Sequence, residues 1–184
     1  MRHLSVLSCL MILALGFSPR GQAAEREVPA VPATIAALDL SRYLGHWVEI
    51  ARYPNRFQRH CVGDVQADYR LLPEGRVEVT NRCRNENGAM SEAVGVARQI
   101  GAADSPRLEV RFAPAWLSFI PAVWGDYWVI DLDEAYQLAA VSGPSREYLW
   151  ILSRTPEVAP AVYAALLERL RAQGFDLEKL QRTP

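Results

Sequence analysis

The chain has 184 residues, of which 50% are hydrophobic and 22% are charged, a composition typical of compact globular proteins rather than disordered or fibrous ones. Twenty Lys and Arg residues nearly balance 21 Asp and Glu residues, so the formal net charge is -1. This balance excludes the strongly basic surface that a nucleic-acid backbone reader needs, and no nucleic-acid partner is expected. Three His and three Cys residues are too few and too scattered for a zinc-finger module, so neither a metal nor a cofactor is expected.

The N-terminus has the pattern of a secretory signal peptide. Arg2 and His3 precede an apolar run from Leu4 to Phe17, and small residues suited to cleavage follow at Gly21 to Ala23. The run has about 14 residues, whereas a membrane-spanning helix needs about 20. We therefore expect residues 1–23 to be removed and the mature chain to be exported to the periplasm.

Cys9 leaves a second fate open for the N-terminus. Val6-Leu7-Ser8-Cys9 loosely resembles the lipobox of bacterial lipoproteins, but an acylated cysteine should follow the apolar stretch and Cys9 lies inside it. A soluble periplasmic protein is therefore the preferred interpretation, and association with the outer membrane is the alternative.

Cys61 and Cys83 are the two cysteines that remain after cleavage at that site. The periplasm permits disulfides, so an even pair favours a Cys61–Cys83 bond, and two buried free thiols are the alternative. The bond would close a loop of about 22 residues and stabilise the fold by about 3 kcal/mol if chain entropy dominates.

Alternation of apolar and polar residues dominates the chain from Trp47 to Arg154. Residues 24–38, with a Pro and Ala spacing typical of an extended arm, are assigned as a leader into a domain over residues 39–184. Turn-forming residues recur in that domain about every ten residues. The pattern predicts eight up-and-down strands, near residues 47–53, 62–72, 76–84, 91–100, 107–113, 126–131, 136–142 and 147–154.

One amphipathic helix is predicted after the strands. Pro160 suits a first helical turn, Val162, Leu166 and Leu170 repeat every four residues, and Gly174 ends the run. The apolar stripe of this helix must be covered by the outside of the sheet. An eight-stranded antiparallel sheet tends to close, because closure removes exposed edges. The predicted fold is therefore an all-β, eight-stranded up-and-down barrel with one C-terminal helix packed outside, and its interior can hold one small ligand.

Three motifs, in the expected order, resemble those of the lipocalin family. Gly45-x-Trp47 within Tyr43 to Arg52 resembles the first motif, and Asp133 with Tyr136 within Val129 to Tyr136 resembles the second. The third is Tyr148 to Pro156, centred on Arg154. The resemblance runs from about Leu40 to Leu180 and is to the bacterial outer-membrane lipocalins and apolipoprotein D.

The resemblance gives structural roles to the motif residues. Trp47 is expected to plug the closed end of the barrel, with the guanidinium of Arg154 across its ring in a cation–π contact. Gly45, Asp133 and Tyr136 are expected to be structural parts of the same motifs. Glu49, next to the Trp, is expected to form hydrogen bonds at the barrel floor.

The strand count places Cys61 and Cys83 at the open end of the barrel. A hairpin centred on Glu74, however, pairs Cys83 with Val65 rather than with Cys61. A disulfide therefore requires a bulge or a curled start of the second strand.

A ligand cavity is expected inside the barrel, because the inward positions are mostly apolar and aromatic. A core filled by side chains is the alternative, since small barrels can be solid. The residues expected to line the cavity are Ala51, Tyr53, Val65, Ala67, Tyr69, Val77, Val79, Asn81, Leu108, Val110, Phe112, Tyr127, Val129, Tyr148 and Trp150.

Two features are expected at the cavity mouth. The uncharged loop from Ala113 to Gly125 contains Trp116 and Trp124, which are expected to contact ligand or a membrane surface, unless the loop folds down as extra core. Arg56 and Arg59, on the first loop, are expected to pair with a carboxylate or phosphate head group, or else to be simply solvated.

The predicted function is binding, storage or transport of one amphipathic lipid, a fatty acid or lysophospholipid, in the cell envelope, as the resemblance implies. Another apolar ligand, such as a pigment or haem, and a lipocalin-type isomerase are the alternatives. No enzyme activity is expected, because His46 and His60 lie in no recognisable catalytic motif. Either a monomer or a homodimer is compatible with the sequence.

Overall fold

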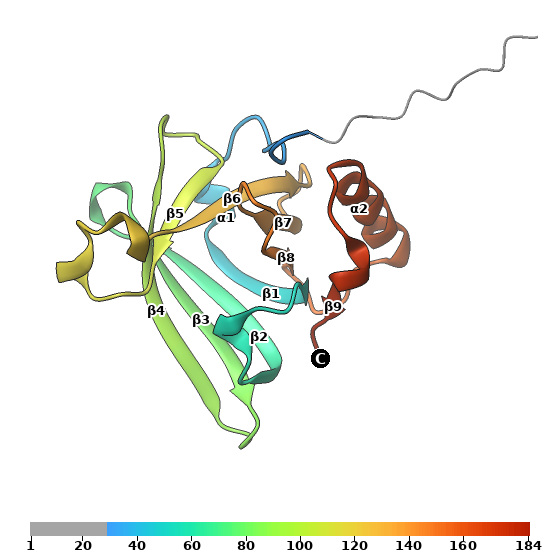
Figure 1. The fold of residues 1–184 in the computed structure, drawn as a ribbon, viewed down its shortest axis with the longest axis horizontal. Coiled ribbons are helices and arrows are strands. Elements are labelled where there is room, and N and C mark those ends of the chain that lie inside the picture. The colour runs from blue at the N-terminus through green and yellow to red at the C-terminus, as the bar shows by residue number, and fades with distance from the viewer. Residues whose placement is uncertain (1–28) are drawn as a thin grey trace, which may run out of the picture.

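Eight antiparallel strands form a closed barrel in the computed structural model, which describes residues 29–184 (Figure 1). β1 pairs with β2 on one side and with β8 on the other, and this closes the sheet. Each strand begins and ends within two residues of its predicted position. The strands are β1 (Gly45–Arg52), β2 (Cys61–Leu71), β3 (Val77–Asn85), β4 (Met90–Gln99), β5 (Arg107–Arg111), β6 (Gly125–Leu132), β7 (Leu138–Ser142) and β8 (Leu149–Ser153).

Helices and short turns surround this barrel. The predicted C-terminal helix is α2 (Pro160–Ala172), which lies against the outside of the sheet (Figure 1). Elements that the sequence pattern did not predict are a short helix α1 (Leu40–Tyr43) and a ninth strand β9 (Gln181–Arg182). The 3-10 helices are η1 (Arg56–Gln58), η2 (Pro73–Gly75), η3 (Ala115–Leu117), η4 (Pro121–Val123) and η5 (Leu177–Lys179).

Apolar side chains form two separate clusters, one inside the barrel and one between the barrel and α2. The alternation of β7 serves both clusters, because Ala139 and Val141 belong to the inner one while Leu138 and Ala140 belong to the outer one. Leu166 and Leu170 of α2 are fully buried in the outer cluster, as their spacing predicted.

The predicted signal peptide and Cys9 lie outside the described residues.

A bulge in β1 reverses the orientation of the residues that follow it. The pairing of β1 with β8 shifts between Glu49 and Ala51, so Ala51 lies opposite Ile151 and Arg52 opposite Trp150. Ala51 and Tyr53 therefore belong to the cluster beneath α2. Their predicted position in the cavity wall is wrong, because simple alternation does not include the extra residue of the bulge.

β9 pairs with the second half of β1, which β2 does not contact in a ladder. β1 pairs with β2 only from Gly45 to Val48, and its residues Ala51 and Arg52 pair with β9 instead. The backbone amide of Thr183 also donates to the Ile50 carbonyl at 3.1 Å. The C-terminal segment is thereby part of the barrel wall at the open end.

Residues 29–38, within the segment assigned as a leader, pack along the barrel. Pro32 and Leu38 are buried, and the Ile35 amide donates to the carbonyl of Val129 on β6 at 3.1 Å. Arg146 donates to the Pro29 carbonyl at 2.6 Å. Within residues 29–184, no helix is long and apolar enough to span a membrane.

Candidate ligand-binding site

The closed end of the barrel is built around Trp47, whose side chain is fully buried. The guanidinium carbon of Arg154 lies 3.9 Å from the centre of a Trp47 ring, and this confirms the predicted cation–π contact. Arg154 also donates to the carbonyls of His46 at 2.7 Å and Arg42 at 2.8 Å. The indole nitrogen of Trp47 donates to the Tyr43 carbonyl at 2.8 Å. These bonds provide acceptors for the indole nitrogen of Trp47 and the guanidinium of Arg154 at the barrel floor.

Gly45, Asp133 and Tyr136 lie around the same floor. Gly45 has a positive φ of 91°, a conformation that a side chain would strain. The Asp133 carboxylate accepts from three backbone amides in the turn between β6 and β7. The Tyr136 hydroxyl accepts from the backbone amide of Asp39, and Arg42 lies 3.9 Å from the centre of its ring. All three residues hold chain segments together at the closed end.

Three tyrosines form a hydrogen-bonded group beside Trp47, and the Tyr43 ring centre lies 5.0 Å from that of Trp47. The Tyr127 hydroxyl lies 2.8 Å from that of Tyr43 and 2.9 Å from that of Tyr69. Burial raises the pKa of Tyr69 to about 12 and holds the pKa values of Tyr43 and Tyr127 well above their ordinary value. The group therefore stays neutral at physiological pH.

Side chains nearly fill the lower half of the barrel. A cavity of about 10 Å³ remains there, which is room for about one water molecule. The filled-core alternative thus describes the lower half of the barrel well. This cavity is lined by Leu40, Tyr43, Tyr69, Val77, Val79, Ala97, Leu108 and Tyr127.

The upper half of the barrel is open to solvent on its inner face. Ala67 of the inner cluster lies directly opposite Asn81, which in turn lies opposite Ala93, so all three share the inner face. Ala67 is buried, yet Asn81 and Ala93 are exposed. β5 pairs with β4 only over Val96–Gln99, and Figure 1 shows β2, β3 and β4 running on beyond that region.

Phe112 lies at the same opening. A methyl group on Gly95, whose Cα position faces inward opposite Val79, would meet the Phe112 ring at 2.8 Å. The Phe112 side chain therefore lies over the inner face of β4, while remaining 44% exposed. Among the other predicted lining residues, the structure places Ala67, Tyr69, Val77, Val79, Leu108, Val110, Tyr127, Val129 and Trp150 on the inner side of the wall. Val65 is buried within the irregular part of β2.

An aromatic wall stands on the β8 side of the opening. The rings of Tyr148 and Trp150 stack with centres 5.5 Å apart, and Phe57 of η1 lies 5.7 Å from Tyr148. The Trp150 indole donates to the side-chain oxygen of Gln58 at 2.9 Å, which ties η1 to β8. Phe57 is 56% exposed, so this wall offers accessible apolar surface.

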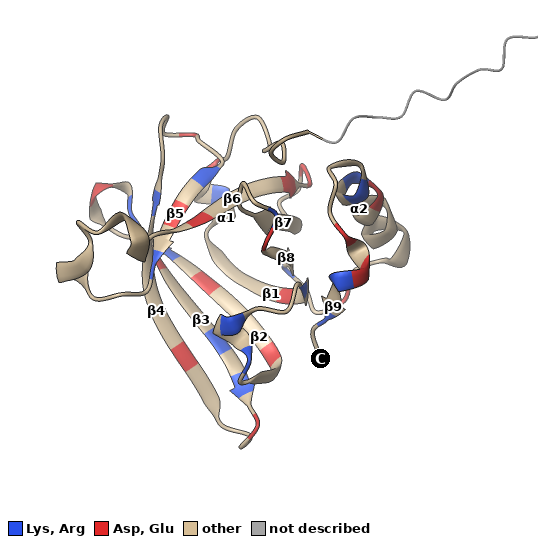
Figure 2. Cartoon of the chain, in the orientation of Figure 1, with Lys and Arg blue, Asp and Glu red and all other residues tan. Residues whose placement is uncertain are grey.

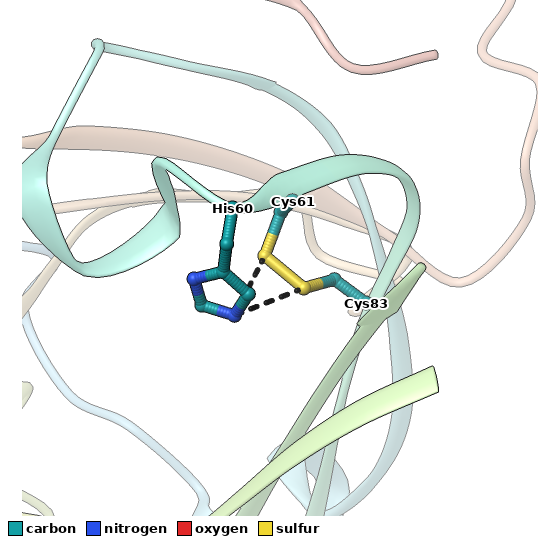
Figure 3. A group of neighbouring side chains, drawn as sticks. All are labelled: His60, Cys61 and Cys83. Carbon is teal, nitrogen blue, oxygen red and sulfur yellow. Dashed lines mark hydrogen bonds between the residues drawn. A yellow bond between two sulfur atoms is a disulfide. The ribbon is translucent and has the colours of Figure 1, made fainter. Parts of the chain in front are cut away.

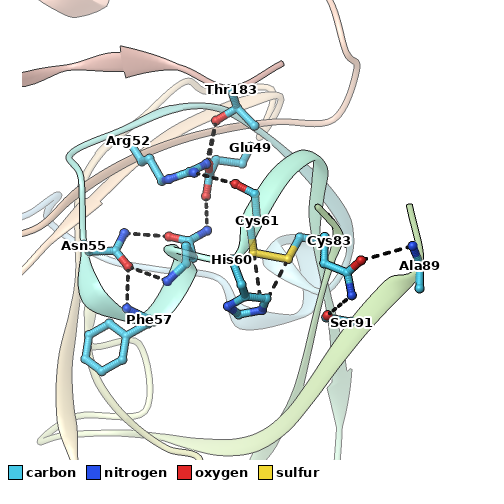
Figure 4. The surroundings of a disulfide bond; sticks show 12 residues. Glu49, Arg52, Asn55, Phe57, His60, Cys61, Cys83, Ala89, Ser91 and Thr183 are labelled. Carbon is cyan, nitrogen blue, oxygen red and sulfur yellow. Dashed lines mark hydrogen bonds and ion pairs between the residues drawn. A yellow bond between two sulfur atoms is a disulfide. The ribbon is translucent and has the colours of Figure 1, made fainter. Parts of the chain in front are cut away.

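An ion pair inside the open end was not predicted. Arg52, turned inward by the bulge, donates to Glu49 at 2.5 Å, and the buried Glu49 also accepts from Thr183 at 2.5 Å and Gln58 at 2.6 Å (Figure 4). The partners of Glu49 thus come from the open end and not from the barrel floor, where we expected them. The inward parity of Glu49 was visible in the sequence, but the bulge that supplies Arg52 was not.

Arg56 and Arg59 are both exposed at the open end, on and directly after η1. Arg56 lies 5.0 Å from the centre of the Phe57 ring, and the Arg59 side chain donates to the Arg56 carbonyl at 3.4 Å. Both side chains are therefore accessible to solvent on the loop that carries Phe57 of the aromatic wall.

The loop between β5 and β6 projects from the barrel, and Figure 2 shows no charged residue along it. Trp116 is 72% exposed and Phe119 is 77% exposed. Trp124 instead packs on the outer face of the sheet, 4.1 Å from Arg98 and 5.3 Å from Arg111. Its predicted position at the cavity mouth is wrong, because these outward arginines attract the ring.

A disulfide joins Cys61 and Cys83 at the start of β2, with the two Cα atoms 5.5 Å apart (Figure 4). The pairing of β2 with β3 shifts register twice, between Cys61 and Gly63 and between Gly63 and Gln66. These irregularities are the bulge that the bond was expected to need. The disulfide therefore fixes the loop that carries η1 to β3.

Comparisons with known proteins agree with this architecture. The family described as a lipocalin-like domain matches residues 38–184. Temperature-induced lipocalin-1 of Arabidopsis thaliana is 41% identical over 152 residues, which cover 82% of this chain and 81% of the relative. The outer membrane lipoprotein Blc of Escherichia coli K12 is 40% identical over 142 residues, covering 77% and 76% of the two chains.

A solved structure shows the same fold at low sequence identity. Insecticyanin from the tobacco hornworm Manduca sexta superposes with a TM-score of 0.63 at 18% identity, over 84% of this chain and 83% of the other. The matched barrel, the three sequence motifs and the Arg154–Trp47 contact all agree with the family match. The chain therefore belongs to the lipocalin family.

Proposed function

We propose that this protein binds one amphipathic lipid, a fatty acid or a lysophospholipid, and acts as a binding protein rather than an enzyme. The observation that carries the proposal is the contrast along the inner face of the sheet. Inward residues of the lower half, such as Val79 and Leu108, are buried, whereas Asn81, Ala93 and Phe112 of the upper half are exposed. An acyl chain that enters the upper half would cover this surface.

The floor and the mouth suggest how such a lipid would be oriented. Tyr69 and Tyr127 fill the lower barrel, so the acyl chain would end above them. Arg52 is neutralised by Glu49, which leaves the exposed Arg56 and Arg59 as cations for a carboxylate or phosphate at the mouth. The chain would then lie along the aromatic wall.

The exposed loop supports contact with a membrane surface. Trp116 and Phe119 together present two large aromatic side chains on a loop without charge. Trp is favoured at the boundary between lipid and water, and exposed apolar patches of this kind commonly mark interaction sites. A lipid could pass from the bilayer to the barrel beside this loop.

A place in the cell envelope is part of the proposal. The similar proteins from Escherichia coli and Vibrio cholerae are named outer membrane lipoproteins. We expect the exported chain to lack residues 1–23 and to carry no acyl group. The intact mass of the periplasmic protein tests this expectation, and a diacylglyceryl adduct on Cys9 would overturn it.

Binding is tested by displacement of a fluorescent fatty acid with palmitate and with a lysophospholipid. The variant Ala93→Trp would fill the upper interior and weaken binding by about tenfold or more, which corresponds to about 1.4 kcal/mol. The control Val94→Trp places the same ring on the outer face of β4, one residue away, and should bind like the wild type. Equal affinity of both variants would contradict the proposed position of the lipid.

A further inference from the structure

Three potential metal ligands meet at the open end of the barrel (Figure 3). His60 precedes β2, Cys61 is the first residue of that strand, and Cys83 lies on β3. The Nε2 atom of His60 lies 3.8 Å from the Sγ atom of Cys61 and 3.8 Å from that of Cys83. The three donor atoms all lie within 4.8 Å of one another.

These spacings suit a tetrahedral metal site. Zn²⁺ binds thiolate sulfur at about 2.3 Å and imidazole nitrogen at about 2.0–2.1 Å. Tetrahedral angles then place two sulfur ligands about 3.8 Å apart, and a sulfur and a nitrogen about 3.6 Å apart. The Nε2 atom of His60 lies 3.8 Å from each sulfur, close to the separation that a tetrahedral site requires of a nitrogen and a sulfur ligand. Only the sulfurs must separate, and reduction of their bond permits this.

We propose that His60, Cys61 and Cys83 form a redox-gated site for a thiophilic divalent cation such as Zn²⁺. A dithiol reductant supplies two electrons and two protons, which converts the Cys61–Cys83 bond into two thiols and the reductant into its own disulfide. Each thiol releases its proton as it binds the metal. Nε2 of His60 is the third ligand, and a water molecule completes the tetrahedron.

The surrounding chain can accommodate the exchange. His60 is exposed and Cys61 is partly exposed, whereas Cys83 is buried, so a reductant would reach the disulfide from the Cys61 side. Cys61 lies directly after the η1 loop and pairs with Asn85, and the register of β2 shifts immediately after it, between Cys61 and Gly63, so the regular ladder is interrupted beside the disulfide. The metal would thus replace the covalent link between β2 and β3 under reducing conditions.

The test uses the full-length chain with Cys9→Ser, so that Cys61 and Cys83 are the only thiols. The protein is reduced with dithiothreitol, desalted without oxygen and titrated with Co²⁺, whose absorption reports thiolate ligation and tetrahedral geometry. We expect one Co²⁺ per reduced chain, displaced by Zn²⁺, and no such signal from the oxidised chain. A reduced chain that binds no Co²⁺ would overturn the proposal.

Two variants test whether His60 itself contributes to metal binding. His60→Ala should weaken binding by at least about tenfold, because loss of even an outer-shell partner commonly costs that much. His46→Ala removes another exposed imidazole, which lies at the start of β1 beside Asp68 of β2, and this variant should bind the metal like the wild type. Equal binding by His60→Ala and the wild type would contradict the assigned ligand set.

If the chain loses its structure on reduction, the metal site can still be tested by refolding. If circular dichroism shows that the reduced chain unfolds, Zn²⁺ should restore the folded spectrum of the wild type and not that of His60→Ala. A reduced wild type that stays unfolded with saturating Zn²⁺ would count against the site.

Discussion

The guanidinium carbon of Arg154 lies 3.9 Å from the centre of a Trp47 ring, at the closed end of the barrel. The same guanidinium donates to backbone carbonyls of Arg42 and His46, so one side chain links β8, α1 and the start of β1. The indole below it has no exposed surface. This contact therefore fixes the barrel floor and leaves the ligand site to the opposite end.

Replacing Trp47 tests that role. Trp47→Ala should lower the free energy of unfolding by about 3–5 kcal/mol, because it empties the floor and removes the partner of Arg154. Trp116→Ala is the matched control, since Trp116 is 72% exposed, and should change stability by no more than about 0.5 kcal/mol. Urea denaturation measures both, and similar values for the two variants would contradict the structural role of Trp47.

Two alanines on neighbouring strands distinguish the inner face from the outer one. Ala67 lies in the inner cluster, whereas the bulge turns Ala51 toward α2. Ala51→Leu should overpack the helix interface and lower stability by about 1–3 kcal/mol while lipid affinity stays unchanged. Ala67→Leu should weaken lipid binding, and because Ala67 is buried in the inner cluster opposite Trp47 it should also lower stability. A loss of affinity in Ala51→Leu would place that residue in the cavity wall after all.

The bulge also shows where prediction from the sequence ends. Strand positions were predictable because alternation of apolar and polar residues marks a strand with one face on a core. Ile50 and Ala51 are consecutive apolar residues that both lie in the cluster beneath α2. Simple alternation would turn one of them into the barrel, and nothing in the sequence marks the bulge that turns both outward. The inward position of Arg52, and with it the Glu49 ion pair, depends on that one extra residue.

The buried tyrosines predict a loss of stability at alkaline pH. Burial raises the pKa of Tyr69 to about 12 and those of Tyr43 and Tyr127 well above the ordinary value, whereas all three ionise near pH 10 in the unfolded chain. Above pH 10 the unfolded chain therefore holds fewer protons than the folded chain, and the free energy of unfolding falls as pH rises. Below pH 10 the contribution of these groups to stability is fully present.

Denaturation measured at several pH values from 9 to 12 tests this linkage. Each buried phenol should add about 1.4 kcal/mol per pH unit to the downward slope while its unfolded form is ionised. Tyr127→Phe removes one of the three and should make the slope shallower. An identical slope in this variant would show that the buried hydroxyls do not govern alkaline unfolding.

The aromatic loop should act in lipid transfer and not in folding. Trp116→Ser combined with Phe119→Ser should leave the melting temperature unchanged, because both side chains are exposed, while slowing uptake of a fluorescent fatty acid from phosphatidylethanolamine and phosphatidylglycerol vesicles. Trp124→Ser should lower the melting temperature, since that ring packs on Arg98. Unchanged uptake by the double variant would end the membrane-contact proposal.

The same loop shows a second boundary of prediction. Its position between strands and its lack of charge were evident in the sequence, and these features indicated exposure. The direction of Trp124 depends on Arg98 and Arg111. Alternation places Arg111 outward, between the inward Val110 and Phe112, but the meeting of both arginines with the loop follows only from the assembled sheet. Pairs that meet across strands carry no local signature in the sequence.

The most direct test of the central claim is native mass spectrometry of the purified protein, followed by extraction and identification of what it carries. The account predicts one fatty acid or lysophospholipid per chain, and a reduced bound fraction in Ala93→Trp relative to Val94→Trp. A coloured ligand would indicate a different ligand class. A chain that carries nothing, both as purified and after incubation with palmitate and lysophospholipid, would contradict lipid binding in the upper barrel.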